Sequence, residues 1–237
     1  METLQEKLVC AGGCHVDGHF VGVQRSFVNL HAAHVKVANT DRIGSISVNR
    51  LSALLHAKPS RTTSAVVILQ LGHYESTKSL SLMGRRSGAT PPDSARKKSS
   101  QRPSTPYEGN PPVRELVKLI GVAARDALSR SAFDTARFEA QLDVCLQRLR
   151  QTRPRAVFLL STFPTQSRAR NIYRRRANEI LRRQAARHGV EFLDVYDTLY
   201  DQQFVHRNDL FIDEGHLNEA GHALLADLLD RHLAAAY

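Results

Sequence analysis

Short apolar runs alternate along the chain with segments in which apolar residues recur every three or four positions. Apolar runs bounded by polar turns are typical of strands buried on both faces of a parallel sheet. Such runs predict five strands, at residues 7–12, 35–39, 65–71, 156–161 and 190–195.

The segments between these runs have the 3, 4 and 7 spacing of amphipathic helices. Apolar positions from Phe20 to Leu30 predict a first helix, and those from Ile46 to Leu55 predict a second. The same spacing predicts four more helices, at residues 113–128, 133–149, 172–184 and 219–235.

Strands that alternate with helices favour right-handed crossovers. We therefore expect an α/β fold: a three-layer, doubly wound (flavodoxin-like), mostly parallel sheet of about five strands with helices on both faces. With 237 residues, the chain is long enough for one sizeable core, and a single domain is expected over residues 1–237. Ligands bind beyond the carboxyl ends of the strands in such sheets, so polar residues that follow a strand are the candidates for chemistry.

Residues 84–112 interrupt this pattern. They hold six prolines, several serines and a basic run, with hardly any large apolar residue. Such a segment buries too little apolar surface to offset the entropy lost on ordering. We predict a flexible, basic, Pro/Ser-rich insertion that is too short to be a domain.

The composition is that of a soluble globular protein, with 42% hydrophobic and 24% charged residues. Its three cysteines, Cys10, Cys14 and Cys145, suggest neither a disulfide framework nor a zinc site, and no cofactor is expected. The first residues lack the basic and apolar regions of a signal peptide, and no apolar stretch is long enough to span a membrane. We expect a cytoplasmic protein in which Cys14 stays a thiol.

A net charge of +10 is concentrated in the insertion and in residues 168–187, where eight arginines accompany the single acidic residue Glu179. A solvated basic helix face is the simpler interpretation. The alternative is an anionic substrate or partner, such as a phosphate-bearing acyl carrier, coenzyme A or an acidic polysaccharide. No aromatic residues are interleaved in a stacking pattern, which argues against nucleic acid.

The segment near the carboxyl terminus is the most informative for function. It reads Asp213-Glu-Gly-His216-Leu-Asn-Glu-Ala-Gly-His222 and leads into the last predicted helix. An aspartate three residues before a histidine on a turn can orient the imidazole, which can then serve as a general base toward a nucleophile from elsewhere. The simpler alternative is a surface turn whose aspartate caps a helix.

This segment resembles the last conserved block of the SGNH (GDSL-type) hydrolases, which reads Asp-x-x-His and is often followed by Pro-Asn-x-x-Gly-His; here Leu217 replaces the proline. The first block of that class is a strand followed by Gly-Asp-Ser, with serine as the nucleophile. Gly12-Gly13-Cys14 follows the first predicted strand in the same way. The resemblance implies Cys14 as nucleophile, His216 as general acid/base and Asp213 as the orienting carboxylate.

The two middle blocks of the class supply a glycine amide and an asparagine to the oxyanion hole, and they are matched less well. Gly44 follows the second predicted strand, and Gly72 follows the third, but the asparagine expected after Gly72 is absent. The resemblance implies that Gly13, Gly44 and Gly72 line the site, together with His73 or Tyr74 as a substitute for the asparagine. The loss of one oxyanion donor costs about a hundredfold or more in rate in other enzymes.

Three functions are compatible with these residues. The first is a hydrolase that acts on acyl esters or thioesters through an acyl-Cys14 intermediate. The second is an acyltransferase that passes the acyl group to a sugar or polysaccharide. The third is a catalytically inactive binding module on the same fold, motivated by the missing asparagine and the changed nucleophile.

Other candidate residues have simpler explanations. Cys10 and Cys145 lie within apolar patterns, which favours packing, and Cys14 could also be a buried structural thiol. His15 and His19 could line the same pocket as Cys14, or they could be solvated histidines on a loop. Together with Asp17 they could bind a metal, but their spacing matches no known metal motif, so no metal is expected.

Overall fold

The central sheet consists of five parallel strands in the order β2-β1-β3-β4-β5. The computed structural model describes residues 7–77, 112–127, 133–200 and 210–233. The strands are β1 (Lys7–Gly12), β2 (Asn39–Ile43), β3 (Val66–Gln70), β4 (Ala156–Leu160) and β5 (Glu191–Leu193). This is the doubly wound α/β fold expected from the sequence.

The second strand was predicted too early, at residues 35–39. Helix α1 (Phe27–His34) has Val35 as its C-cap, and Lys36 adopts a positive φ of 57°, so the apolar run forms the turn after a helix. The observed β2 carries the polar sequence Asn-Thr-Asp-Arg-Ile, because it is an edge strand that pairs only with β1. An edge strand does not need the continuous apolar run of a central strand.

The first helix also begins later than predicted. The chain forms a 3-10 turn at Val23–Arg25, and Ser26 then caps α1 by accepting a hydrogen bond from the amide of Asn29. Phe20, the predicted start, has a positive φ of 71°, which a helix does not allow.

The remaining predicted helices are found close to their expected bounds. They are α2 (Val48–Ala57), α4 (Pro112–Ala127), α5 (Thr135–Gln151), α6 (Arg168–His188) and α9 (Glu219–Leu233). Two short helices that the sequence pattern missed are α3 (His73–Thr77) and α7 (Tyr196–Tyr200). No helix among these described residues is long and apolar enough to cross a membrane.

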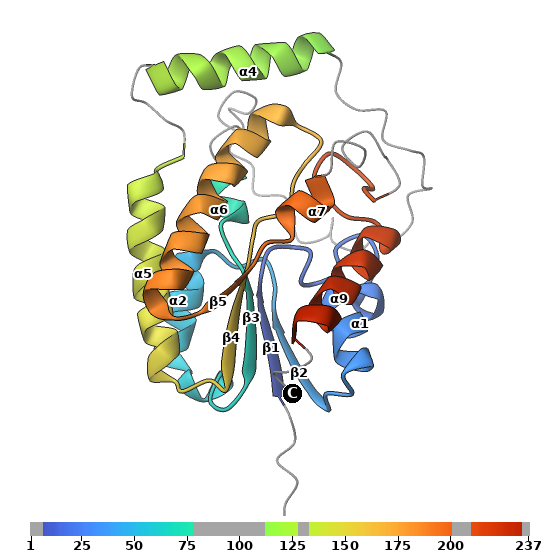
Figure 1. Cartoon of the computed structure of the whole chain (residues 1–237), viewed down its shortest axis with the longest axis vertical. Coiled ribbons are helices and arrows are strands. Elements are labelled where there is room, and N and C mark those ends of the chain that lie inside the picture. Colours follow the sequence, from blue (N-terminus) through green and yellow to red (C-terminus); the bar gives the residue numbers. More distant parts are fainter. Residues whose placement is uncertain (1–6, 78–111, 128–132, 201–209, 234–237) are drawn as a thin grey trace, which may run out of the picture.

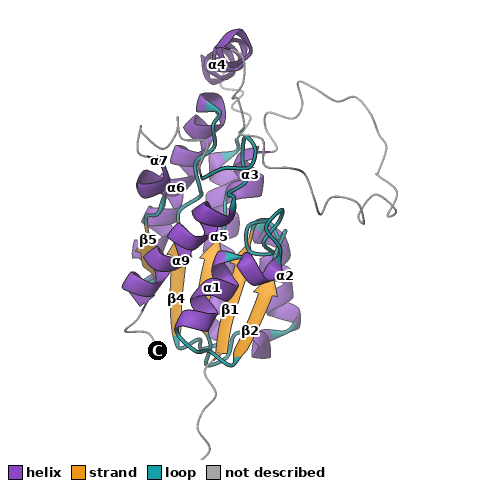
Figure 2. Cartoon of the chain, turned by 90° about the vertical axis from the view of Figure 1, so that its right-hand side faces the viewer, coloured by secondary structure: helices purple, strands orange, loops and turns teal. Residues whose placement is uncertain are grey.

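Helices cover both faces of the sheet (Figure 1, Figure 2). On one face, α2, α5 and α6 pack on the inward side chains Val9, Val67 and Leu159. On the other face, α1 and α9 pack on Leu8 and Ile68 and on their neighbours. Alternate side chains of each central strand therefore belong to two separate cores, which is why these strands are continuously apolar.

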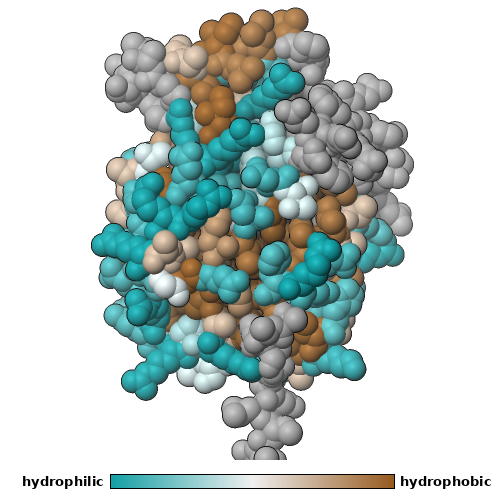
Figure 3. Space-filling model, in the orientation of Figure 1, coloured by the Kyte–Doolittle hydropathy of each residue, from teal (hydrophilic) through white to brown (hydrophobic). Residues whose placement is uncertain are grey.

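Helix α4 lies at the end of the molecule where the strands finish, next to the first turns of α6 (Figure 1). Its side chains Val113, Leu116, Val117 and Ile120 are 55–73% exposed, and they form the apolar patch over α4 in Figure 3. The predicted insertion at 84–112 lies outside the described residues except for Pro112, and the single domain over 1–237 stays a prediction.

Candidate active site

The nucleophile candidate lies on the turn that follows the central strand β1. A Cβ atom at Gly12 would collide with the carbonyl oxygen of Gln70 at the end of β3, so only glycine fits there. The amide of Gly13 donates a 2.8 Å hydrogen bond to Oε1 of Gln70. The two glycines thus let β3 approach the turn closely and present the partly buried Cys14 beyond the strand.

The base candidate lies on the loop before α9, where Asp213 organises the backbone as well as the imidazole. Its Oδ1 accepts hydrogen bonds from the amides of Gly215 (2.8 Å) and His216 (2.9 Å). Both carboxylate oxygens lie 2.8 Å from Nδ1 of His216. Although burial opposes it, these hydrogen bonds and the charge of His216 lower the pKa of Asp213. The carboxylate is therefore charged and holds the ring in one orientation.

The structure brings His216 and Cys14 together from opposite ends of the sequence. Burial alone would lower the pKa of His216, but hydrogen bonds with Asp213 and with Cys14, and the charges of both, raise it to about 9. The imidazole is thus protonated at neutral pH, with the carboxylate on one side and the sulfur on the other. Such a pairing is typical of an activated cysteine.

Gly44, the second predicted glycine, follows β2 and lies next to the turn that carries Cys14. The amides of Ser45 and Ile46 donate to the carbonyl oxygens of Gly13 (3.4 Å) and Gly12 (2.9 Å). A Cβ atom at Gly44 would collide with the carboxyl group of Asp17. The segment that starts at Gly44 therefore runs directly along the turn that carries Cys14.

The residues after β3 have different roles: one is explained by packing, and the others belong to the candidate site. Gly72 has a positive φ of 86°, and a Cβ atom there would come within 3.1–3.5 Å of Phe138, Thr162 and Ala177, so its position is explained by packing. Tyr74 is half-buried, and its hydroxyl bonds with Ser45. Burial raises the pKa of Tyr74, with a further contribution from Cys14, so the phenol keeps its proton and can donate it to an acceptor.

His73 is buried, and its ring centre lies 5.5 Å from that of His15. Burial and the charges of Arg174, His216 and Arg170 hold its pKa well below the usual value. A neutral His73 therefore forms part of the wall of the site.

The sequence pattern did not predict that two residues near the site are buried. His15, assigned to a pocket lining or a solvated loop, is 1% exposed and packs edge-on against Phe163 at a ring distance of 5.1 Å. Arg174, part of the basic helix, is 2% exposed and donates to the carbonyl oxygens of Phe163 and of Pro164 (3.2 Å). The run of arginines in the sequence does not distinguish Arg174 from its exposed neighbours.

Several other arginines of α6 are paired on the surface. Arg183 lies 2.9 Å from Glu139, Arg187 lies 3.4 Å from Asp143, and Arg175 stacks 4.6 Å above the ring of Tyr200. These contacts agree with the simpler interpretation of a solvated basic face. They neutralise or cover part of the positive charge on α6 that an anionic partner would contact.

The atoms able to bind a metal in Cys14, His15 and His73 lie within 4.8 Å of one another. Of the three metal candidates considered in the sequence, only His15 belongs to this cluster. However, the amide of Leu217 donates to Nε2 of His15 at 3.4 Å, which places the ring proton on Nδ1, the atom that faces the sulfur. A cation would have to displace that proton, so the cluster fits a hydrogen-bonded site better than a metal site.

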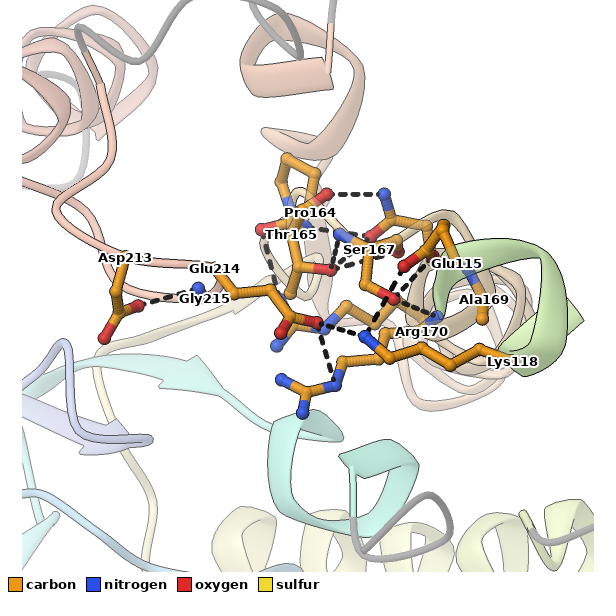
Figure 4. A network of polar contacts seen from close by, with 12 residues as sticks. Glu115, Lys118, Pro164, Thr165, Ser167, Ala169, Arg170, Asp213, Glu214 and Gly215 are labelled. Carbon is orange, nitrogen blue, oxygen red and sulfur yellow. Dashed lines mark hydrogen bonds and ion pairs between the residues drawn. The ribbon is translucent and has the colours of Figure 1, made fainter. Parts of the chain in front are cut away.

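A network of polar contacts links the Asp213–His216 loop to α4 and α6 (Figure 4). The Glu214 carboxylate lies 3.4 Å from both Lys118 and Arg170. The backbone carbonyl oxygen of Glu214 accepts a hydrogen bond from the amide of Gln166 at 2.9 Å. Glu115 of α4 accepts from the Ser167 hydroxyl at 2.9 Å. The loop is therefore tied to two helices beside the residue that orients the imidazole.

Fold and site together define a doubly wound α/β protein with an Asp–His pair facing a residue beyond the first strand. A family model described as the GDSL-like lipase/acylhydrolase family matches residues 47–224. The chain belongs to this family of esterases and acylhydrolases, within the SGNH superfamily. The match begins after Cys14 and therefore does not include that residue.

Solved structures support the fold. A member of the lipolytic G-D-S-L family from Veillonella parvula is 17% identical with a TM-score of 0.63, covering 97% of this chain and 98% of that one. An α/β hydrolase enzyme from the metagenome of Lake Arreo is 18% identical with a TM-score of 0.62, covering 98% and 94%. A catalytic mutant of an acetylxylan esterase from Geobacillus stearothermophilus is 13% identical with a TM-score of 0.60, covering 95% and 93%. A comparison with curated proteins finds no match.

Proposed function

We propose that the protein hydrolyses acyl esters or thioesters through a covalent acyl-Cys14 intermediate. The observation that carries this proposal is the position of His216, which bonds to Asp213 on one side and to the Cys14 sulfur on the other. A thiolate beside an imidazolium is a competent nucleophile and needs no further base for the attack.

The first half of the reaction transfers the acyl group to sulfur. The Cys14 thiolate attacks the carbonyl carbon, and the electron pair of the C=O bond moves to the oxygen. When the tetrahedral intermediate collapses, the bond to the alcohol or thiol breaks, and protonated His216 gives its proton to that leaving group. Asp213 holds the ring throughout and stabilises its charged form.

The second half releases the acid. Neutral His216 takes a proton from water as the water oxygen attacks the thioester carbonyl. The intermediate then expels the Cys14 thiolate, which restores the thiolate–imidazolium pair. Water contributes hydroxide to the acid and its proton to His216, so atoms and charge balance.

We expect the negative charge on the oxyanion to be stabilised by hydrogen bonds from the backbone amides of Cys14 and Gly44 and from the Tyr74 hydroxyl. Tyr74 stands two residues after Gly72, where the family pattern has its asparagine, and bonds to Ser45 beside Gly44. The Gly13 amide is already bonded to Gln70, which assigns Gly13 to the support of the turn. Preorganised donors of this kind are worth about a hundredfold or more each in rate.

The nucleophile is tested by measuring the turnover of p-nitrophenyl acetate and an acetyl thioester. Replacing Cys14 by Ala, or His216 by Asn, should lower kcat/KM by roughly a thousandfold or more, since the nucleophile and base act as a unit. His56→Asn, on the exposed face of α2, is the matched control and should leave the rate unchanged. Equal rates in wild type and Cys14→Ala would overturn the mechanism.

The substrate class is addressed by trapping the acyl-enzyme on Cys14 by intact-protein mass spectrometry. Acetylated sugars belong in the panel because three structural neighbours are named as esterases of acetylated xylan or xylooligosaccharides. Sugar acceptors added to the reaction distinguish hydrolysis from acyl transfer: free acid alone supports a hydrolase, and an acylated sugar supports the acyltransferase. Absence of any adduct with every ester and thioester would favour the binding module.

A further inference from the structure

His15 contacts both halves of the candidate site. Its side chain is 1% exposed, with Nδ1 lying 4.0 Å from the Cys14 sulfur and Nε2 lying 3.4 Å from the amide nitrogen of Leu217. Leu217 directly follows His216. One buried imidazole thus bridges the turn that carries the nucleophile and the loop that carries the base.

The contact with Leu217 fixes which nitrogen of His15 carries the proton. A backbone amide can only donate, so Nε2 must accept and the proton lies on Nδ1. Burial, followed by the charges of His73, His216, His222 and Arg174, holds the pKa of His15 well below its usual value. The ring is therefore neutral with a single N–H, and that N–H is on the nitrogen beside the sulfur.

We propose that His15 is a second catalytic histidine, whose Nδ1–H donates to the Cys14 sulfur and stabilises its thiolate form. The hydrogen bond strengthens when the sulfur is charged, because a thiolate is a far better acceptor than a thiol. His15 transfers no proton and makes no bond in the reaction. This inference rests on the proposed function only in taking Cys14 as the nucleophile.

Other groups also face the sulfur, and the test has to separate His15 from them. They come from three further parts of the fold: His216 with Asp213 from the loop before α9, His73 and Tyr74 from α3, and Arg174 from α6. Substitutions at His15 that keep or remove its single N–H leave all of these in place.

Three variants test the two contacts of His15 separately. In His15→Asn the amide nitrogen can take the place of Nδ1 and keep the donor to sulfur. In His15→Gln the amide group reaches the place of Nε2, which keeps an acceptor for Leu217 but removes the donor to sulfur. His15→Leu removes both contacts, and His56→Leu on α2 is the surface control.

The measurement is the rate of iodoacetamide alkylation of Cys14 as a function of pH, followed by peptide mass spectrometry. We expect the midpoint of this profile to rise by about one to two pH units in His15→Leu and His15→Gln, because a hydrogen bond to a charged group is lost. His15→Asn and His56→Leu should keep the wild-type midpoint. Thermal unfolding is recorded in parallel, and if His15→Leu does not fold, the Asn and Gln variants decide the question.

Unchanged midpoints in both Gln and Leu variants would overturn the proposal, as would an Asn variant shifted as far as Leu. Alkylation does not require turnover, so the two proposals fail separately. A shift of the midpoint without any hydrolysis of esters or thioesters would refute the proposed function and leave standing the hydrogen bond from His15 to the sulfur.

Discussion

At the scale of single residues, the protonation of His216 couples the site to stability. The pKa of this histidine is raised to about 9 in the folded protein, against an ordinary value of 6.5. A group that binds its proton more tightly when folded stabilises the fold below its unfolded pKa, and this contribution is lost as the pH rises through the folded pKa. The stabilisation is therefore complete below pH 6.5 and declines up to about pH 9.

This predicts that the melting temperature of the wild type falls between pH 6.5 and 9 by more than that of His216→Asn, which lacks the titrating group. Thermal unfolding followed by circular dichroism at several pH values measures the difference. Parallel pH profiles for the two proteins would contradict the raised pKa.

The second prediction at this scale concerns Arg174. Its guanidinium is buried, burial lowers its pKa to about 9, and it holds the carbonyl groups of Phe163 and Pro164. Arg174→Met leaves these acceptors unpaired and should reduce the free energy of unfolding by about 1–3 kcal/mol. The exposed Arg175 provides the control, since Arg175→Met loses only solvent-exposed contacts with the rings of Tyr196 and Tyr200 and a hydrogen bond with Tyr196, and it should cost less than about 1 kcal/mol. Urea denaturation compares the two, and equal costs would rule out a special role for the buried guanidinium.

At the scale of elements, the loop before α9 depends on ion pairs with its neighbours. Glu214 lies between Lys118 of α4 and Arg170 of α6, one residue after Asp213 (Figure 4). Glu214→Gln removes the charge, and a partly exposed ion pair is worth up to about 1 kcal/mol. We expect kcat to fall by up to about fivefold because the imidazole is held less firmly.

The control is Glu219→Gln at the start of α9, which removes the ion pair with Arg25. Its side chains are more than half exposed, so steady-state kinetics should be unchanged. A Glu214→Gln enzyme with the wild-type kcat would show that the loop holds its shape without α4 and α6.

The elements also show which parts of the fold and of the candidate site can be predicted from the sequence. The central strands β1, β3 and β4 were predicted within one residue because burial on both faces forces an apolar run. The edge strand β2 was misplaced because nothing requires Asn39–Ile43 to be apolar. The pair Asp213 and His216 was predicted from its spacing because its contacts are local. The Gln70 bond to Gly13 and the bridging role of His15 depend on residues distant in sequence, and no local pattern encodes them.

At the scale of the whole molecule, the sheet separates two cores that do not share side chains. Leu142 of α5 is fully buried in one, and Leu225 of α9 is fully buried in the other. Each Leu→Ala change should cost about 2–5 kcal/mol. Because the sites lie on opposite faces, the double variant should lose the sum of the two within about 0.5 kcal/mol. Denaturant unfolding of the four proteins tests this, and a clearly smaller loss would mean that the faces are energetically coupled.

The distance along the chain between Cys14 and His216 has a consequence for synthesis. About two hundred residues separate Cys14 from Asp213, His216 and the Leu217 amide that donates to His15, so these partners are made later than the sulfur. During translation the sulfur therefore has none of these partners. On the proposed function, the complete pair of nucleophile and base therefore arises only once α9 has docked against α1.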